Sequence, residues 1–297
     1  MSRLVFIVGP TATGKTDVAY NIAKRSGADI VSCDSMLVYR EPCIVTAKPD
    51  KEILSEVKHH FIDIISVTQE YNVFDYYLSA TQKIKEFLSR GKSVIVCGGT
   101  GLYMKALLDG LADTPAKDDE LRKQLTERAR SEGLDVLYEE LEKIDSVYAQ
   151  KISHNDLKRI VRALEVYKLT GKTISEFKPD ANNGLWGKYD IDIFAVEYTR
   201  DELYDRINKR VDVMFEKGVV DEVKEILKFE LSVSAKKIIG IPEIKEYIDW
   251  RITFNDCKEL MKKNTRNYAK RQLTWFRADK RIKWVENADE VLSRVKV

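Results

Sequence analysis

The sequence predicts an α/β fold in which helices flank a parallel sheet, and two observations support this. Short apolar runs, such as Leu4–Val8 and 93–97, alternate with segments of helical periodicity. The first run also leads directly into the spacing G-x-x-x-x-G-K-T, followed by another helical pattern. This strand, loop and helix are typical of a P-loop NTPase-like core.

The glycine-rich loop supplies the chemistry of a phosphate cradle. Gly9 and Gly14 allow the backbone to curl until successive N–H groups point at one anion. Lys15 adds a cation, and the hydroxyl of Thr16 can hold Mg²⁺. We therefore expect phosphate contacts from the whole loop, which consists of Gly9, Pro10, Thr11, Ala12, Thr13, Gly14, Lys15 and Thr16.

The elements of the core follow in order. After the loop, apolar residues recur at helical spacing until Gly27, which predicts the first helix. A further helix is expected at 73–88. Later strands are predicted at 28–33, 93–97 and 191–196.

The middle of the chain has a different character. From about residue 113 to 190 strands disappear, charge rises, and amphipathic helices are predicted at 119–131 and 155–169. We interpret this segment, 113–190, as an inserted all-helical lobe. It would separate the first part of the core, 1–112, from its remainder and a basic helical C-terminal region, 191–297.

Composition excludes several classes of protein. Apolar residues make up 44% of the chain and charged residues 33%, with a net charge of +2, as in a globular protein with a real core. No run approaches the roughly 20 apolar residues of a membrane span. The four cysteines are scattered, so neither a disulfide framework nor a zinc site is expected. We expect a cytoplasmic protein, and nothing demands more than a monomer.

Polar residues follow two of the predicted strands. Asp34 and Ser35 come after the strand at 28–33, and Thr100 follows Gly98-Gly99. Because ligands bind at the carboxyl ends of parallel strands, these side chains should face a bound polyphosphate. Taken alone, Asp34 could cap a following helix, and Thr100 could be a turn residue. In the site, Asp34 could either support Mg²⁺, as in a kinase, or act as a base.

Arginines follow the last core strand. Thr199 and Glu202 have the spacing of a capping box and begin a long helix with an apolar face. Arg200 lies in its first turn, and Arg206 and Arg210 lie one turn apart. These cations could clamp a leaving phosphate, or they could form a solvated helix face.

Two basic clusters suggest a polyanionic partner. In the C-terminal region Lys263, Arg266 and Lys270 share one stripe of a predicted helix, opposite apolar residues. On the inserted lobe, Lys158, Arg159 and Arg162 lie beside apolar positions. Charge runs are usually solvated faces, but two such clusters in a chain of net charge +2 favour phosphate contacts with a nucleic acid.

At this point the motifs can be compared with a known family. The stretches concerned, in order, are Gly9–Thr16, Asp34-Ser35 with Tyr39, Thr46–Pro49, Gly98–Tyr103, Asn155-Asp156 with Arg159 and Arg162–Tyr167, and Thr265-Arg266 with Tyr268–Trp275. Together they resemble the tRNA dimethylallyltransferases (tRNA isopentenyltransferases) along nearly the whole chain. The chain departs from the family pattern at Val45, where the family has glycine, and at Ile241, where it has tyrosine.

The resemblance implies an activity and assigns residues to it. The enzyme would transfer a dimethylallyl group from dimethylallyl diphosphate to N6 of an adenosine beside the anticodon of tRNA. Asp34 would be the general base, Thr100 would grip the substrate end of the reaction channel, and Arg200 and Arg206 would assist the diphosphate held by the loop. Implied tRNA contacts are Asp34, Ser35, Met36, Leu37, Thr100, Arg122, Lys158, Arg159, Ile160, Val161, Arg162, Lys237, Ile238, Ile239, Gly240, Ile241 and Pro242.

Three other functions share parts of this pattern. An adenylate isopentenyltransferase acting on free AMP would share the core, but it needs neither the lobe nor the basic stripe. A P-loop small-molecule kinase would use the loop for ATP. A non-catalytic RNA-binding P-loop protein would use only the basic surfaces.

Overall fold

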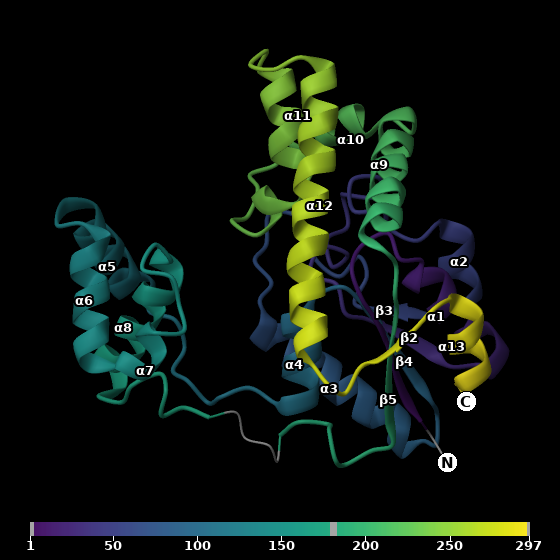
Figure 1. Cartoon of the computed structure of the whole chain (residues 1–297), viewed down its shortest axis with the longest axis horizontal. Coiled ribbons are helices and arrows are strands. Elements are labelled where there is room, and N and C mark those ends of the chain that lie inside the picture. The colour runs from purple at the N-terminus through teal and green to yellow at the C-terminus, as the bar shows by residue number, and fades with distance from the viewer. Residues whose placement is uncertain (1–2, 179–182, 296–297) are drawn as a thin grey trace. The chain divides into compact units, whose positions relative to one another are not determined.

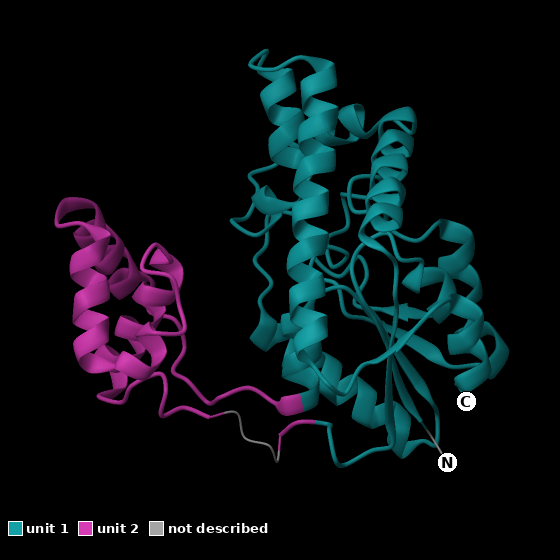
Figure 2. Cartoon of the chain, in the orientation of Figure 1, with its two compact units in different colours: residues 1–108, 185–297 teal, residues 109–184 magenta. Residues whose placement is uncertain are grey.

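The computed structural model describes residues 3–178 and 183–295, which form two compact units (Figures 1 and 2). The first unit contains 1–108 and 185–297, and the second contains 109–184, where the sequence predicted a lobe at 113–190. Residues 179–182 and 296–297, which fall in the predicted lobe and C-terminal region, lie outside the described part of the chain.

A six-stranded parallel sheet forms the centre of the first unit, in the order β3-β2-β4-β1-β5-β6. The four strands predicted from the sequence are confirmed. The two others, of two and three residues, were not predicted because so few residues carry no periodicity. The strands are β1 (Leu4–Val8), β2 (Asp29–Ser32), β3 (His59–His60), β4 (Val94–Gly98), β5 (Ile191–Val196) and β6 (Lys283–Val285).

The register of the strands brings three chain segments to one edge. Val8 at the end of β1 pairs with Gly98 at the end of β4, and Ser32 at the end of β2 pairs with Cys97. All these pairings are parallel. The Gly9–Thr16 loop, Asp34 and Thr100 therefore leave the sheet at the same edge, as the sequence predicted.

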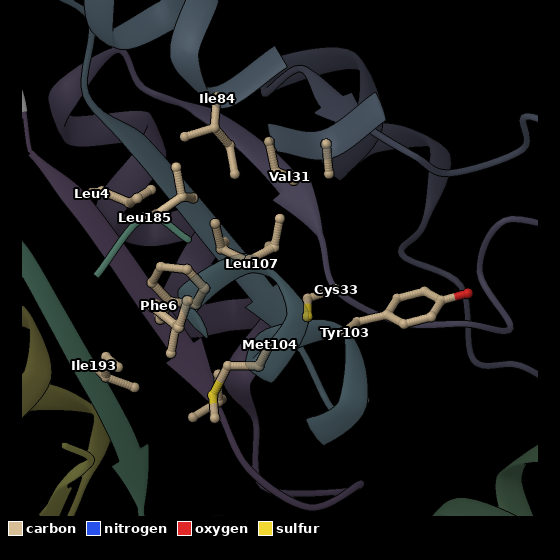
Figure 3. Packing of buried hydrophobic residues seen from close by; sticks show 14 of the residues in the cluster. Leu4, Phe6, Val31, Cys33, Ile84, Tyr103, Met104, Leu107, Leu185 and Ile193 are labelled. Carbon is tan, nitrogen blue, oxygen red and sulfur yellow. The ribbon is translucent and has the colours of Figure 1, made fainter. Parts of the chain in front are cut away.

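Helices cover both faces of the sheet. Alternate residues of β1 point to opposite faces, with Leu4 and Phe6 on one and Val5 and Ile7 on the other. Figure 3 shows the first face, where side chains of α3 and α4 meet the strands. The helices on this face are α3 (Val73–Ser89) and α4 (Gly101–Asp109), and those on the other are α1 (Lys15–Ser26) and α13 (Ala288–Arg294).

A group of helices follows β5 in the chain. Thr199 caps the first of them by accepting a hydrogen bond from the N–H of Glu202, which confirms the predicted capping box. Its predicted apolar residues Leu203, Ile207 and Val211 are buried. The helices are α9 (Arg200–Glu216), α10 (Val219–Ile226), the 3₁₀ turn η1 (Ala235–Lys237), α11 (Ile241–Ile248) and α12 (Phe254–Ala278); α2 (Lys51–Glu56) lies earlier in the chain.

The second unit has its own core. Leu125, Leu137, Leu141 and Leu164 are buried there, each at the apolar face of a helix. Within residues 109–178 and 183–184 all of its elements are helices, as predicted. They are α5 (Asp119–Ser131), α6 (Leu134–Ile144), α7 (Ser146–Ala149) and α8 (Leu157–Thr170).

The chain leaves and rejoins the first unit at hydrogen-bonded neighbours. The N–H of Leu185 donates to the carbonyl of Leu107 at 2.9 Å, and the N–H of Trp186 donates to the carbonyl of Leu108 at 3.0 Å. Leu107 and Leu185 are both fully buried in the core. The two ends of the insertion are thus fixed beside each other.

Among the helices of the described residues, none combines the length and the apolar character needed to cross a membrane.

Candidate active site

A cavity of about 410 Å³ lies at the carboxyl edge of the sheet, within the first unit. One group of lining residues is polar, with Lys15, Thr16, Asp34 and Thr100 from the three segments that the register brings together. The remaining lining contains polar and apolar side chains. Its apolar part comes mainly from loops and from the helices after β5, and includes Met36, Leu37, Val211, Met214, Ile238 and Met261. A charged ligand with an apolar portion would match both kinds of lining.

The Gly9–Thr16 loop is held in the curled form that the sequence predicts. Gly14 has a φ of 77° and is the N-cap of α1, so the first N–H groups of that helix face the loop's concave side. The carbonyl of Pro10 accepts hydrogen bonds from the hydroxyl of Thr13 at 3.0 Å and from Nζ of Lys15 at 2.8 Å. Ala12 also has a positive φ, of 66°. These bonds orient the loop before any ligand binds.

Two half-buried cations accompany the loop. Burial lowers the pKa of Lys15, although the nearby Cys97 and Asp34 act in the opposite direction. Burial likewise lowers the pKa of Arg210, opposed by Asp34 and Asp17. Arg210 lines the cavity. Sequence reasoning named this arginine among the cations that could clamp a leaving phosphate, whereas the family resemblance assigned that role to Arg200 and Arg206. Helical spacing alone does not tell which of two neighbouring faces points inward.

Asp34 and Thr100 are held in position by the backbone. Oδ1 of Asp34 accepts a hydrogen bond from the N–H of Met36 at 2.9 Å. Oγ1 of Thr100 accepts from the N–H of Ser35 at 3.0 Å and lies 3.3 Å from the hydroxyl of Ser35, to which it donates. Asp34 stabilises a turn, and the next helix, α2, begins only at residue 51, so Asp34 is not a helix cap.

The close approach of β2 and β4 explains why residue 98 is a glycine. A Cβ atom on Gly98 would lie 2.1 Å from the carbonyl oxygen of Cys33, which leaves no space for a side chain. The N–H of Thr100 also donates to this carbonyl, at 3.1 Å. The absence of a side chain at residue 98 thus allows Thr100 to lie beside Cys33, the residue that precedes Asp34.

One face of α12 forms a wall of the cavity that the sequence reasoning missed. Thr265, Tyr268 and Gln272, spaced by three and four residues, line the cavity together with Arg271. Burial raises the pKa of Tyr268, with Asp34 acting in the same direction, so its hydroxyl remains protonated and able to donate. The spacing of Thr265, Tyr268 and Gln272 could have indicated this wall, because it places them on the side of the helix away from the stripe of Lys263, Arg266 and Lys270.

The two arginines predicted to assist the diphosphate lie outside the cavity lining. Nε of Arg206 donates to the carbonyl of Ala12 at 2.7 Å, and its guanidinium lies over the ring of Tyr198. The guanidinium of Arg200 lies over the ring of Tyr204, on an exposed part of α9. Arg206 therefore contacts the loop from outside, and a direct role for either in catalysis stays a prediction.

Several predicted tRNA contacts of the first unit lie around the cavity. Ser35, Met36, Leu37, Lys237, Ile238 and Ile239 all line it. Gly240 and Ile241 are not part of the lining: Ile241 is buried in the core, and a Cβ on Gly240 would lie 2.4 Å from Cγ2 of Val45. Pro242 occupies the first turn of α11 and is exposed. Val45, a departure from the family pattern, thus packs directly on Gly240.

In the second unit, two predicted contact residues share a buried carboxylate. Glu165 is 0% exposed and accepts hydrogen bonds from Arg122 at 2.8 and 2.9 Å and from Arg162 at 2.6 Å. Burial opposes ionisation of Glu165, but these hydrogen bonds outweigh it and lower its pKa. Ile160 and Val161 are buried in the same core, whereas Lys158 and Arg159 are exposed.

The basic stripe of α12 is divided by its contacts. Lys263 and Lys270 are exposed. Nη1 of Arg266 instead donates to Oδ1 of Asn208 at 2.6 Å, and its guanidinium lies 5.8 Å from the centre of the Tyr204 ring. Two of the three predicted cations are therefore directed to solvent, and the third joins α12 to α9.

The polar end of the cavity suits one kind of metal ion. Residues 3–178 and 183–295 contain no group of three or more His, Cys, Asp or Glu side chains that could hold a metal. Thr16 and Asp34 do line the same cavity, and they offer one hydroxyl and one carboxylate. Mg²⁺ usually takes one or two protein oxygens and completes its shell with phosphate oxygens and water, so this donor set fits it.

The chain was also compared with known proteins. The model of the family "IPP transferase" matches residues 37–279. A tRNA dimethylallyltransferase of Geobacter sulfurreducens is 45% identical over 96% of this chain and 92% of its own length. A tRNA dimethylallyltransferase 2 of Geotalea daltonii is 42% identical, over 96% of this chain and 87% of its own.

Solved structures agree with these relatives. A tRNA isopentenylpyrophosphate transferase from Bacillus halodurans is 37% identical, with a TM-score of 0.69 over 96% of this chain and 90% of that one. A eukaryotic dimethylallyltransferase acting on tRNA is 29% identical, with a TM-score of 0.78 over 93% of this chain and 70% of that one. The family model and the identity to curated relatives both extend over most of the sequence, and the chain therefore belongs to the IPP transferase family.

Proposed function

We propose that this protein transfers a dimethylallyl group from dimethylallyl diphosphate to N6 of the adenosine next to the anticodon, position 37, of a tRNA, and releases diphosphate. The observation that carries the proposal is the common cavity of the Gly9–Thr16 loop, Asp34 and Thr100. An anion site and a carboxylate at one apolar-lined cavity suit a prenyl diphosphate and a nucleophile that must lose a proton. The names of the relatives support the same reaction.

The carboxylate of Asp34 makes the adenine amine of the acceptor more reactive. The lone pair of the exocyclic amine is delocalised into the adenine ring, so the amine is a poor nucleophile. Asp34 takes the N6 proton as the nitrogen bonds to the allylic carbon, which is typically worth about 10²–10⁴-fold in rate. The hydrogen bond from Met36 leaves the second carboxylate oxygen available for that proton.

The loop and its cations act on the leaving group. As the bond between the allylic carbon and the oxygen breaks, its electron pair leaves with the diphosphate, and negative charge develops there. The N–H groups at the start of α1, with Lys15 and Arg210, stabilise this charge in a partly desolvated cavity, where such contacts are stronger than in water. With Asp34 acting as the base, Thr16 is the residue that would hold Mg²⁺, which would supply further positive charge to the diphosphate.

The acceptor must leave its base stack before it can enter the cavity. Flipping a base out of a stack costs a few kcal/mol, and contacts with the rest of the RNA offset this cost. The exposed cations Lys263 and Lys270 of α12, and Lys158 and Arg159 of the second unit, are available for phosphate contacts.

The experiment supplies radiolabelled dimethylallyl diphosphate and Mg²⁺ with three acceptors: tRNA carrying adenosine at position 37, the same tRNA with guanosine there, and AMP. Label should enter only the first. Transfer to AMP instead would identify an adenylate isopentenyltransferase. In a parallel reaction with ATP and candidate small-molecule acceptors, phosphoryl transfer would identify a kinase. RNA binding with no transfer in either reaction would indicate a non-catalytic protein.

We further propose that the protein acts in the cytoplasm as a monomer. All four of its cysteines are unpaired thiols, which suits a reducing compartment. Light scattering of the purified protein, with and without tRNA, measures the number of copies, and a mass of twice the 34.2 kDa chain would contradict a monomer.

A further inference from the structure

Gln272 connects two parts of the site that lie far apart in the sequence. Its Oε1 accepts a hydrogen bond from the N–H of Thr11 at 2.9 Å, and its Nε2 donates to the carbonyl of Gly99 at 2.8 Å. The side chain is 5% exposed and lines the cavity. Because a backbone N–H only donates and a carbonyl only accepts, these partners fix the orientation of the amide.

The two partners belong to different functional segments. Thr11 lies in the loop that faces the phosphates, and Gly99 immediately precedes Thr100. The Thr100 turn is in turn bonded to Ser35, next to Asp34. Through one amide, which we call the Gln272 bridge, the anion loop is joined to the turn that presents the acceptor side of the site.

The packing around the bridge leaves little freedom. A Cβ on Gly99 would lie 2.3 Å from Nε2 of Gln272, so the helix and the turn are in direct contact there. One turn along α12, Trp275 lies against Gly101, where a Cβ would meet it at 3.2 Å. The helix therefore contacts the turn at two successive points, and Gln272 also hydrogen-bonds to the loop.

We propose that Gln272 is a positioning residue that fixes the separation between the Gly9–Thr16 loop and the Thr100 turn. This inference rests on the proposed function, since that separation sets the distance between the donor's reacting carbon and the acceptor nitrogen. A displacement of about 1 Å between reacting groups can cost about 10²-fold in rate. Gln272 itself touches no reacting atom; its effect passes through the two segments.

The first test replaces the amide with an apolar side chain of similar length. Gln272→Met should lower kcat about 10- to 100-fold while the KM for tRNA changes less than twofold, because misplacement affects the transition state more than tRNA binding. Thr274→Val, two residues along the same helix on an exposed face, is the matched control and should retain wild-type kcat. An unchanged kcat for Gln272→Met would overturn the proposal.

A second variant distinguishes positioning from general loss of structure. The carboxylate in Gln272→Glu can accept from Thr11 but cannot donate to Gly99 until it is protonated. Burial favours the protonated form. The ratio of its kcat to that of the wild type should therefore rise as the pH falls, whereas the ratio for Gln272→Met should stay flat. A flat ratio for both variants would contradict the bridge.

The contact between residue 99 and Gln272 can also be tested with a pair of substitutions, one that creates a steric clash and one that removes it. Gly99→Ala alone should lower kcat strongly, because its methyl group meets the amide. In the Gln272→Ala background the same change should cost much less, since the opposing amide is gone. Multiplicative effects of the two changes would contradict the contact.

Failure of the proposed function is distinguishable from failure of the bridge. If the wild-type protein transfers no prenyl group, the proposed function fails, and the bridge is judged by affinity for inorganic diphosphate and by hydrogen exchange at residues 9–16. Gln272→Met should then weaken diphosphate binding and speed exchange in the loop, and Thr274→Val should not. Wild-type values for Gln272→Met in both measurements would exclude the bridge.

Discussion

The Nε atom of Arg206 donates a hydrogen bond to the carbonyl oxygen of Ala12 at 2.7 Å, at a residue with a positive φ. This contact holds the loop from the side of α9. One turn further along the same helix, Arg210 is half-buried and lines the cavity. The two arginines therefore differ in what they touch, and this difference can be measured.

Neutralising Arg210 should harm catalysis more than neutralising Arg206. Arg210→Gln should lower kcat about 10²–10³-fold, the range for losing one group that stabilises developing charge. Arg206→Gln should act mainly on the KM for the prenyl diphosphate, because the loop loses an outside support. Steady-state kinetics of both variants, with exposed Lys209→Gln as control, checks this. Equal losses of kcat would show that Arg206 also reaches the diphosphate.

Replacing Asp34 by Asn tests the general base. The amide oxygen can still accept from Met36, so the turn should persist, but it cannot take a proton at neutral pH. We expect a loss of about 10²–10⁴-fold in the single-turnover rate, with tRNA affinity within twofold of the wild type. Should tRNA binding collapse while bound tRNA is still converted normally, the base assignment would be wrong.

The exposed lysines of α12 should contribute to the salt dependence of tRNA binding. Each phosphate contact contributes about 0.7–0.9 to the slope of log affinity against log salt concentration, so Lys263→Gln with Lys270→Gln should reduce the slope by about 1.5. Filter binding at several salt concentrations measures it.

Arg266 provides the contrast for this surface. Because its guanidinium is bonded to Asn208, Arg266→Gln should mainly lower thermal stability. An unchanged salt slope in the double lysine variant would exclude the surface, and a large change in slope for Arg266→Gln would show that this residue leaves Asn208 for the RNA.

Glu165 should make the second unit sensitive to acid. Although burial opposes ionisation, the hydrogen bonds from Arg122 and Arg162 hold the pKa of Glu165 below its ordinary value. Its stabilising effect is therefore present above the pKa of the unfolded carboxyl, and is lost as the pH falls through the lower pKa of the folded one. Glu165→Gln should destabilise the unit by about 3 kcal/mol at neutral pH and weaken this pH dependence.

Hydrogen exchange in the whole chain, over 119–131 and 157–170, is the measurement for Glu165. Glu127→Gln, an exposed carboxyl of α5, is the control and should exchange as the wild type does. If Glu165→Gln leaves exchange unchanged at pH 7, the buried carboxylate does not stabilise the unit.

The thiols should differ in reactivity. Burial raises the pKa of Cys97 to about 12 and that of Cys257 to about 11, and it also raises the pKa of Cys33, so little thiolate forms at pH 8. Cys43 is exposed. A thiol reagent in excess should label one cysteine rapidly, and Cys43→Ser should remove that phase. A second rapid thiol would show that the cavity around Cys97 is open to charged reagents.

Sequence reasoning succeeded where a feature repeats or has a fixed spacing. Short segments rich in apolar residues predicted β1, β2, β4 and β5, and the capping spacing predicted the start of α9. Their parallel pairing then placed Asp34 and Thr100 beside the loop without further information. β3 and β6 escaped because two or three residues at a sheet edge carry no pattern.

Residues whose role depends on a distant partner could not be assigned. Arg122 and Arg162 were taken as RNA contacts, and only the folded unit shows that both bind Glu165. Gln272 lies 261 residues from Thr11 along the chain, so no local spacing relates them. The inner face of α12 was in principle visible, but the cations on its other side gave the stronger signal.

The paired bonds of Leu107 with Leu185 and Leu108 with Trp186 have a consequence for how such proteins diversify. Because these bonds hold the two ends of the core chain side by side, a short loop could replace the 76 residues between them without changing the order of the strands in the sheet. Recombination could thus exchange the insertion for one that fits a different acceptor, while the donor chemistry is inherited intact.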